Sequence, residues 1–253
     1  MTPIRTALIT GASQGLGRAL AGALAARGWR LLLTARTAAD LSATADALPV
    51  EAEVVAVPGD VSDADHRDDL RLVVDEWGRL DVLVNNASTL GPTPLRPLRD
   101  LTSDELAEIL SVNVVAPHAL ARLLLPALEV AGGVVLDISS DAAVEHYETW
   151  GGYGASKAAL DHLTLTLGAE QSRIRAYALD PGDMRTAMHQ SAFPGEDISD
   201  RPLPSDLAVP AALSLLDRRP ESGRYRASDL LTDAPTAPAA TAPTGAPPSG
   251  VAS

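Results

Sequence analysis

The 253-residue sequence contains no cysteine, only one phenylalanine and, by direct count, a single lysine, Lys157. The absence of cysteine excludes disulfide bonds, thiolate metal sites and a cysteine nucleophile. Lysine and arginine together number 20, so every other basic residue is an arginine. A chain that replaces lysine everywhere else but keeps it at one position indicates that this position needs an ammonium group.

Positive charge is also scarce, since the formal net charge is −13. This balance argues against nucleic acid or an anionic membrane as a main partner. No apolar run reaches the roughly 18 residues that are typical of a membrane span. The N-terminal residues Met1–Arg5 lead directly into a strand-like segment and leave no room for a signal peptide. We therefore expect a cytoplasmic protein that has neither nucleic acid nor a membrane as its partner.

Short apolar runs alternate with longer amphipathic stretches along most of the chain. The expected strands are Thr6–Thr10, Arg30–Thr34, Val54–Val57, Val82–Asn85, Val134–Ile138, Arg175–Leu179 and Arg224–Ala227. The expected helices run from the glycine-rich turn to Ala26, over Ala38–Leu48, from a capping box at Ser62 and Asp65 to Trp77, from Thr102 and Glu105 to Leu128, and over Gly154–Ala169 and Asp206–Leu216. This alternation predicts an α/β fold, a doubly wound Rossmann-type parallel sheet of about seven strands with helices on both faces.

The composition changes near the C-terminus, where Ala, Pro, Thr, Gly and Ser dominate and Asp233 is the only charge. Such a segment cannot bury enough apolar surface to offset the entropy lost on ordering. We therefore expect one catalytic domain over residues 1–231 and a disordered tail over residues 232–253.

A glycine-rich turn, Thr10-Gly11-Ala12-Ser13-Gln14-Gly15-Leu16-Gly17, connects the first expected strand to the first helix. Glycines permit a tight turn and let the backbone approach a pyrophosphate, which the helix N-terminus can bind. Glycine triplets also arise by chance, but the position between a strand and a helix favours a dinucleotide site.

The end of the second strand indicates which dinucleotide binds. NAD sites usually have an acidic residue here for the ribose 2′-hydroxyl, whereas this chain has Ala35 followed by Arg36. A guanidinium suits a 2′-phosphate, so the sequence favours NADP(H). The alternative is that Arg36 is an ordinary solvated arginine.

Tyr153 and Lys157 stand four residues apart and therefore share one face of an expected helix. A nearby ammonium stabilises a phenolate, so we expect Lys157 to lower the pKa of Tyr153 toward the range useful for proton transfer. An isolated Tyr-x-x-x-Lys often lies on a solvated surface. Here it contains the only lysine and follows Ser140, which ends a strand.

Together these motifs resemble the short-chain dehydrogenase/reductase family in its compact single-domain branch, over about residues 4–230. The motifs are Thr10–Gly17, Asp60-Val61, Asn85-Asn86-Ala87, Asn113, Ser140, Tyr153, Lys157, and Pro181-Gly182 with Thr186. The resemblance implies an NADP(H)-dependent oxidoreductase that interconverts a small-molecule carbonyl and an alcohol. It also implies a homodimer or homotetramer formed through the helices over 103–128 and 154–169, and no metal site.

The family's catalytic roles transfer to four positions. The resemblance implies that Asn113 holds a water in a proton relay and that Ser140 hydrogen-bonds the substrate oxygen. It further implies that Tyr153 gives or takes the proton, while Lys157 binds the nicotinamide ribose and lowers the pKa of the tyrosine.

The family's cofactor roles transfer in the same way. The resemblance implies that Asp60 and Val61 border the adenine, that Asn86 lies beside the cofactor, and that Thr186 contacts the nicotinamide carboxamide. The full expected cofactor site is Gly11, Ser13, Gln14, Gly15, Leu16, Gly17, Arg36, Asp60, Val61, Asn86, Ala87, Tyr153, Lys157, Pro181, Gly182 and Thr186.

Two segments are expected to border the substrate, residues 141–152 after the catalytic serine and residues 187–206, whose prolines and glycine suggest a lid. Their aromatic residues indicate a partly apolar pocket. Two other functions remain open: a catalytically idle NADP(H)-sensing regulator on the same fold, and a sugar-nucleotide epimerase or dehydratase with a similar tyrosine–lysine pair. The complete set of proton-transfer residues argues against the first. The glycine spacing, the short C-terminal region and Arg36 argue against the second.

Overall fold

A computed structural model describes residues 3–232 of the chain. Seven parallel strands form one sheet in the order β3-β2-β1-β4-β5-β6-β7. Their bounds are β1 Thr6–Thr10, β2 Arg30–Thr34, β3 Val54–Ala56, β4 Val82–Asn85, β5 Val134–Ile138, β6 Arg175–Asp180 and β7 Gly223–Arg226. The expected doubly wound fold is therefore confirmed.

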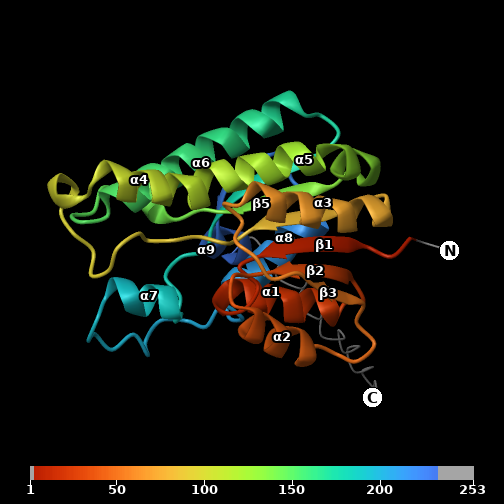
Figure 1. Cartoon of the computed structure of the whole chain (residues 1–253), viewed down its shortest axis with the longest axis horizontal. Helices are drawn as coiled ribbons and strands as arrows, with labels where there is room; N and C mark the ends of the chain where they lie inside the picture. The colour runs from red at the N-terminus through yellow and green to blue at the C-terminus, as the bar shows by residue number, and fades with distance from the viewer. Residues whose placement is uncertain (1–2, 233–253) are drawn as a thin grey trace, which may run out of the picture.

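Helices cover both faces of the sheet (Figure 1). One face carries α1 (Gly15–Ala25), α2 (Ala38–Asp46) and α8 (Ala208–Arg218), and the other carries α3 (Ala64–Trp77), α4 (Ser103–Leu110), α5 (Ala116–Ala131) and α6 (Gly151–Glu170). The carboxyl ends of the strands point toward α4 and toward the short helix α7 (Ala187–Ala192), at the left of Figure 1. The order of the strands reverses between β1 and β4, so a crevice is expected at this edge.

Side chains of each strand alternate between two hydrophobic cores. In β1, Ala7 and Ile9 belong to the core beneath α1 and α8, whereas Leu8 belongs to the core beneath α3 and α5. All three are fully buried, as are their neighbours on β2 and β4. Burial on both faces explains why the strands read as continuous apolar runs rather than as alternating patterns.

The start of α3 differs from the expected capping box at Ser62 and Asp65. Asp63 is the N-cap, and its side chain accepts a hydrogen bond from the Asp65 amide. Ser62 lies before the N-cap, and its hydroxyl donates to the carboxylate of Asp60, at 2.7 Å. The prediction was wrong because Ser62 and Asp63 are adjacent and both are residue types that cap helices, so the sequence pattern did not distinguish them.

The long helix expected over Thr102–Leu128 begins as predicted, with a reciprocal capping box between Thr102 and Glu105. It is interrupted by a π-helical segment, Ser111–Val115, between α4 and α5. The whole rod, Ser103–Ala131, is long and apolar enough to cross a membrane by length and composition, a test that core helices of soluble proteins also pass. It passes this test on average hydropathy, although charged residues such as Glu108 and Arg122 interrupt its apolar sequence. Part of it packs on the sheet through Leu120, Leu124 and Leu128.

Helix α6 begins at Gly151, three residues before the expected start at Gly154. A Cβ atom at Gly151 would lie 2.9 Å from Leu98, and one at Gly152 would lie 2.7 Å from Leu101. These glycines therefore lie against leucine side chains, which would have to shift if a larger residue stood at either position. The sequence also did not predict α7 or α9 (Ala227–Thr232). Thr232 thus ends a helix, and the rest of the expected tail lies outside the described residues.

Two glycines of α1 allow a test of the packing at the turn. A Cβ at Gly17 would lie 2.4 Å from the carbonyl oxygen of Gly11 and 2.5 Å from Asn86, whereas one at Gly22 would meet nothing within 4 Å. We expect Gly17→Ala to destabilise the fold by about 1–3 kcal/mol. Gly22→Ala, the matched control, should stabilise it by up to about 1 kcal/mol because alanine favours the helix. Thermal unfolding of both variants measures the difference, and a Gly17→Ala protein as stable as its parent would contradict the close packing.

Candidate active site

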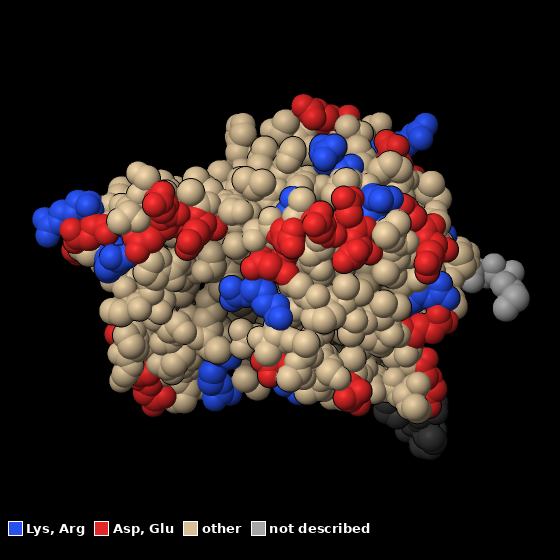
Figure 2. Space-filling view, viewed as in Figure 1, with Lys and Arg blue, Asp and Glu red and all other residues tan. Residues whose placement is uncertain are grey.

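One cleft of about 820 Å³ opens at the carboxyl edge of the sheet. It is lined by the turns that follow β1, β2, β3, β4, β5 and β6 and by α7. In Figure 2 it is visible as the hollow between the part of the molecule that holds α4 and α7 and the part that holds α1 and α2. The switch point of a doubly wound sheet therefore forms a cavity large enough for a dinucleotide and a small molecule.

The glycine turn forms one wall of this cleft. Gly11 and Gly15 have φ angles of 63° and 54°, a left-handed conformation that favours glycine. The N-cap of α1, Gln14, makes no side-chain capping bond, so the first amides of the helix have no such partner beside the cleft. This uncapped N-terminus fits the pyrophosphate of a dinucleotide. Gly17 lies behind the turn rather than in the cleft.

Asn86 holds the turn against the central strand. Its side-chain nitrogen donates to the carbonyl oxygens of Thr10, at 2.9 Å, and Gly11, at 3.1 Å. The Thr10 hydroxyl in turn accepts from the amides of Asn86 and Ala87. The resemblance placed Asn86 beside the cofactor, and the structure shows that it also joins β1 to β4.

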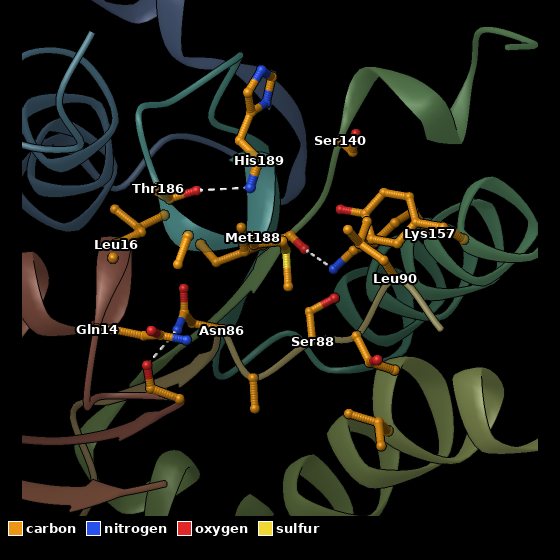
Figure 3. A pocket seen from close by; sticks show the side chains of 18 of the residues that line it. Gln14, Leu16, Asn86, Ser88, Leu90, Ser140, Lys157, Thr186, Met188 and His189 are labelled. Atoms are coloured by element: carbon orange, nitrogen blue, oxygen red, sulfur yellow. Dashed lines mark hydrogen bonds between the residues drawn. The ribbon is translucent and has the colours of Figure 1, made fainter. Parts of the chain in front are cut away.

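The far end of the cleft contains Arg36 together with Ala35, Asp60 and Val61. Ala35 is buried and brings no carboxylate to the end of β2. Across the cleft, Thr186 is the N-cap of α7, and its side chain accepts from the His189 amide. Figure 3 shows Thr186 and His189 on one side of the cleft and Ser140 and Lys157 on the other, with Met188 between them.

Tyr153 and Lys157 are both buried side chains that line the cleft. The Lys157 ammonium donates to the carbonyl oxygen of Ile138, at 2.7 Å, and lies 5.6 Å from the centroid of the Tyr153 ring. The Ser140 hydroxyl donates to the carboxylate of Asp141, at 3.0 Å. The helix α6 and the end of β5 thus bring the three expected residues to one end of the cleft.

The pKa of Tyr153 differs from the sequence-based expectation. Burial raises it, the negative charges of Asp141, Asp180 and Asp161 raise it further, and the Ser140 hydroxyl acts in the opposite direction. The expected lowering by Lys157 was therefore wrong for the protein as it stands. The physical reason is desolvation, which disfavours the phenolate more than the neighbouring groups favour it.

The ammonium of Lys157 is subject to the same effect. Burial lowers the pKa of Lys157 to about 8, although the carboxylates of Asp137 and Asp161 oppose the shift. Burial also raises the pKa of Asp137 to about 6, with hydrogen bonds from Thr164 and Asn85 opposing. The catalytic end of the cleft therefore lies above a buried, mutually dependent set of charges.

Asn113 does not line the cleft. It lies in the π-helical segment and is fully buried. Its side-chain oxygen accepts from the Thr89 amide at 2.8 Å, and its nitrogen donates to the Thr89 carbonyl oxygen at 2.8 Å and to the Ser156 hydroxyl at 2.9 Å. These bonds tie the loop after β4 to α6, and the proposed water-holding role remains a prediction.

The sequence analysis did not identify Arg224 of β7. Its guanidinium donates to Asp161 at 2.9 Å, to Asp180 at 3.1 Å and to the Ser140 carbonyl oxygen at 2.9 Å. Its two carboxylate partners are buried. The sequence carried no local signal for these bonds, because Asp161 and Ser140 lie 63 and 84 positions away from Arg224 in the chain.

Most of the expected site residues meet in this cleft. Those that line it are Gly11, Ser13, Gln14, Gly15, Leu16, Arg36, Asp60, Val61, Asn86, Ala87, Ser140, Tyr153, Lys157, Pro181, Gly182 and Thr186. Gly17 and Asn113 are the two that do not line it. In the described residues, no group of three or more metal-ligating side chains forms a metal site.

Comparison with known proteins gives consistent matches. The sequence profile of the short chain dehydrogenase family matches residues 5–197. A tropinone reductase homologue of Arabidopsis thaliana is 32% identical over 192 residues, which cover 73% of this chain and 71% of that protein.

Two solved structures match the fold. The alcohol dehydrogenase of Thermococcus sibiricus, complexed with 5-hydroxy-NADP, is 30% identical, with a TM-score of 0.77 and coverage of 88% of this chain and 95% of that one. A protein of Shigella flexneri 2a described as a short-chain dehydrogenase, complexed with NADP, is 30% identical, with a TM-score of 0.82 and coverage of 88% and 97%.

The single lysine makes the pKa of Lys157 directly measurable. In protein labelled with ¹³Cε-lysine, NMR should show one lysine signal that titrates near pH 8. Asp137→Asn should lower this pKa further, because it removes a buried negative charge that stabilises the ammonium. Asp217→Asn, a half-exposed aspartate paired with Arg27, is the control and should leave the titration unchanged. A lysine signal that titrates near the ordinary value of 10.5 would contradict the burial of this ammonium.

Proposed function

The chain belongs to the short-chain dehydrogenase/reductase family of oxidoreductases, and on that premise we propose that it interconverts a carbonyl and an alcohol with NADP(H), using Tyr153 as general acid and base. The observation that carries the proposal is the meeting of Tyr153, Lys157 and Ser140 at one end of the cleft whose other end holds the glycine turn and Arg36. When bound, the nicotinamide would supply or accept the hydride.

The fit of the site supports NADP(H). The uncapped N-terminus of α1 suits the pyrophosphate, and Arg36 in the cleft beside the carboxylate-free position 35 suits the 2′-phosphate. The two NADP-containing neighbours support this preference by analogy. Thr186, Asn86 and the Pro181-Gly182 turn would contact the nicotinamide half of the cofactor.

The proton would move at the Tyr153 hydroxyl. The raised pKa keeps this phenol protonated in the free protein, which suits donation to a carbonyl oxygen that gains negative charge. Ser140 would hydrogen-bond the same oxygen and orient it. Lys157 would hold the ribose hydroxyls and place its positive charge near the phenol.

We also propose a homodimer or homotetramer. The helices named for this contact carry exposed apolar side chains, with Val115 54%, Leu163 37% and Leu165 41% exposed. Packing against a second copy would remove this surface from water. The cytoplasmic location expected from the sequence stays a prediction.

The cofactor preference can be tested by titration. We expect NADPH to bind more tightly than NADH, by on the order of ten- to a hundred-fold, which is the range of a few hydrogen bonds to a charged group. Ala35→Asp should narrow or reverse this ratio, because a carboxylate would repel the 2′-phosphate and accept from a 2′-hydroxyl. Ala47→Asp, on an exposed position at the end of α2, is the control. Equal affinity of the parent protein for NADPH and NADH would refute the proposal that Arg36 binds the 2′-phosphate.

The proton-transfer role can be tested with a panel of ketones and the loss of NADPH absorbance. Tyr153→Phe and Lys157→Arg should each lower turnover by about 100- to 10,000-fold. The first should still bind NADPH, while the second keeps the charge in a longer, planar group that displaces the ribose or the phenol.

Tyr225→Phe is the matched control, since this hydroxyl donates to the Glu221 carbonyl outside the cleft. Turnover of Tyr153→Phe within a few-fold of the parent would refute the assignment. A parent protein that binds NADPH but turns over neither carbonyls nor alcohols would support the alternative function, a catalytically idle NADP(H)-sensing regulator.

A further inference from the structure

Aromatic side chains gather at the catalytic end of the cleft. Tyr147, Trp150, Tyr153 and Phe193 account for half of the eight Phe, Trp and Tyr residues of the chain. The Trp150 ring lies 5.6 Å from Tyr153 in an edge-on arrangement and 5.9 Å from Phe193. Trp150 therefore stands between the proposed proton donor and the segment that follows α7.

The surface beside this aromatic cluster is apolar. Leu90, Trp150, Met188 and Ala192 all line the cleft, and they come from three separate connections of the fold. Figure 3 shows Leu90 beside Lys157, and Met188 packs against the cluster of Leu90, Ala142 and Tyr153. A ligand whose reacting atom reaches Tyr153 thus has its body against apolar and aromatic side chains on more than one side.

A carboxylate stands next to the proposed oxygen-binding serine. One oxygen of Asp141 accepts from the Ser140 hydroxyl at 3.0 Å and from the Ala142 amide at 2.8 Å. The other oxygen accepts from the Tyr147 hydroxyl at 2.8 Å. These bonds hold the carboxylate beside the position of the reacting oxygen, and Asp183 is a further acidic residue of the cleft lining.

Cations are scarce at this end. Among the described residues that line the cleft, Arg36 and Lys157 are the lysine and arginine side chains. Arg36 lies with the residues expected around the adenosine, and the Lys157 ammonium is buried against the Ile138 carbonyl oxygen. The imidazole of His189 also lines the cleft, and its Nδ1 lies 3.9 Å from the carboxylate of Asp183. A substrate anion beside Ser140 would lose its hydration, face Asp141 and find, among the described residues, no lysine or arginine partner other than the buried Lys157.

Building on the proposed carbonyl chemistry, we infer that the substrate is a ketone, or the corresponding alcohol, with an apolar ring-bearing body and no anionic group beside the carbonyl. The aromatic and apolar lining binds the body of the molecule. The fixed carboxylate of Asp141 excludes 2-oxo acids and similar anions by like-charge repulsion.

Three probes separate the two parts of this inference. Ethyl 2-oxo-4-phenylbutanoate carries a ring and no charge, its free acid carries a ring and a carboxylate, and ethyl pyruvate carries neither. With NADPH and the parent protein, we expect kcat/KM for the phenyl ester to exceed that for the acid and for ethyl pyruvate by at least about ten-fold each. An acid reduced as well as its ester would overturn the exclusion of anions. Ethyl pyruvate reduced as well as the phenyl ester would overturn the requirement for a ring.

Paired variants assign each preference to its side chain. Asp141→Asn should shrink the ester-to-acid ratio by about ten-fold or more, because the repelling charge is removed while an acceptor remains. Glu145→Gln, an exposed acid four residues along the same loop, should leave the ratio unchanged. Trp150→Ala should shrink the ratio of phenyl ester to ethyl pyruvate, whereas Trp77→Ala, at a half-buried position of α3 outside the cleft, should not. If a variant and its control change the kcat/KM ratio equally, the preference does not depend on the side chain to which it was assigned.

Calorimetric binding separates this inference from the proposed reaction. Ester and acid are titrated into Tyr153→Phe protein saturated with NADPH, where no turnover interferes. Tighter binding of the ester supports the ligand class even if the parent protein reduces no ketone, in which case the proposed reaction fails alone. Tighter or equal binding of the acid overturns the ligand class while the reaction can stand. The binding of ester and acid to Tyr153→Phe protein also tests the exclusion of anions if the Asp141→Asn variant does not fold.

Discussion

The buried ammonium of Lys157 is the constraint on which the active-site end of the fold depends. Removing this charge from water is costly, so the surrounding elements must supply opposite charge and hydrogen-bond acceptors. Ile138 of β5 supplies the acceptor, and Asp137 and Asp161 supply the charge. These carboxylates need partners in turn: Asn85 and Thr164 donate to Asp137, and Arg224 donates to Asp161. One charge thus ties β4, β5, β7 and α6 together.

The sequence predicted the strands more accurately than the ends of the helices. The bounds of β1, β2, β4 and β5 coincide with the predicted segments because strands buried on both faces form unbroken apolar runs. Helix ends depend on contacts that the local pattern does not contain. Asp63 rather than Ser62 caps α3, and the pair Gly151-Gly152, which the prediction placed outside the helix, begins α6 in contact with Leu98 and Leu101.

In the active site, too, local motifs could be predicted from the sequence, whereas contacts between distant residues could not. The glycine turn and Tyr153 with Lys157 are local motifs, so their shared cleft could be predicted from spacing and strand order. Arg224 could not, because its bond to Asp161 joins residues 63 positions apart in the chain. The direction of the Tyr153 pKa shift was also beyond the sequence, because it depends on how deeply the phenol is buried and on the carboxylates of Asp141, Asp161 and Asp180 around it.

The pairing of Ser140 with Asp141 links binding selectivity to the proposed chemistry. In the free protein the Ser140 hydroxyl donates to the carboxylate, so a substrate oxygen must compete for the same proton. A neutral carbonyl oxygen is a weaker acceptor than a carboxylate and competes poorly in the ground state. As hydride transfer places negative charge on that oxygen, its strength as an acceptor approaches that of Asp141. Under the proposed chemistry the serine therefore binds the substrate oxygen more strongly in the transition state than before it, which is the condition for an interaction to raise kcat.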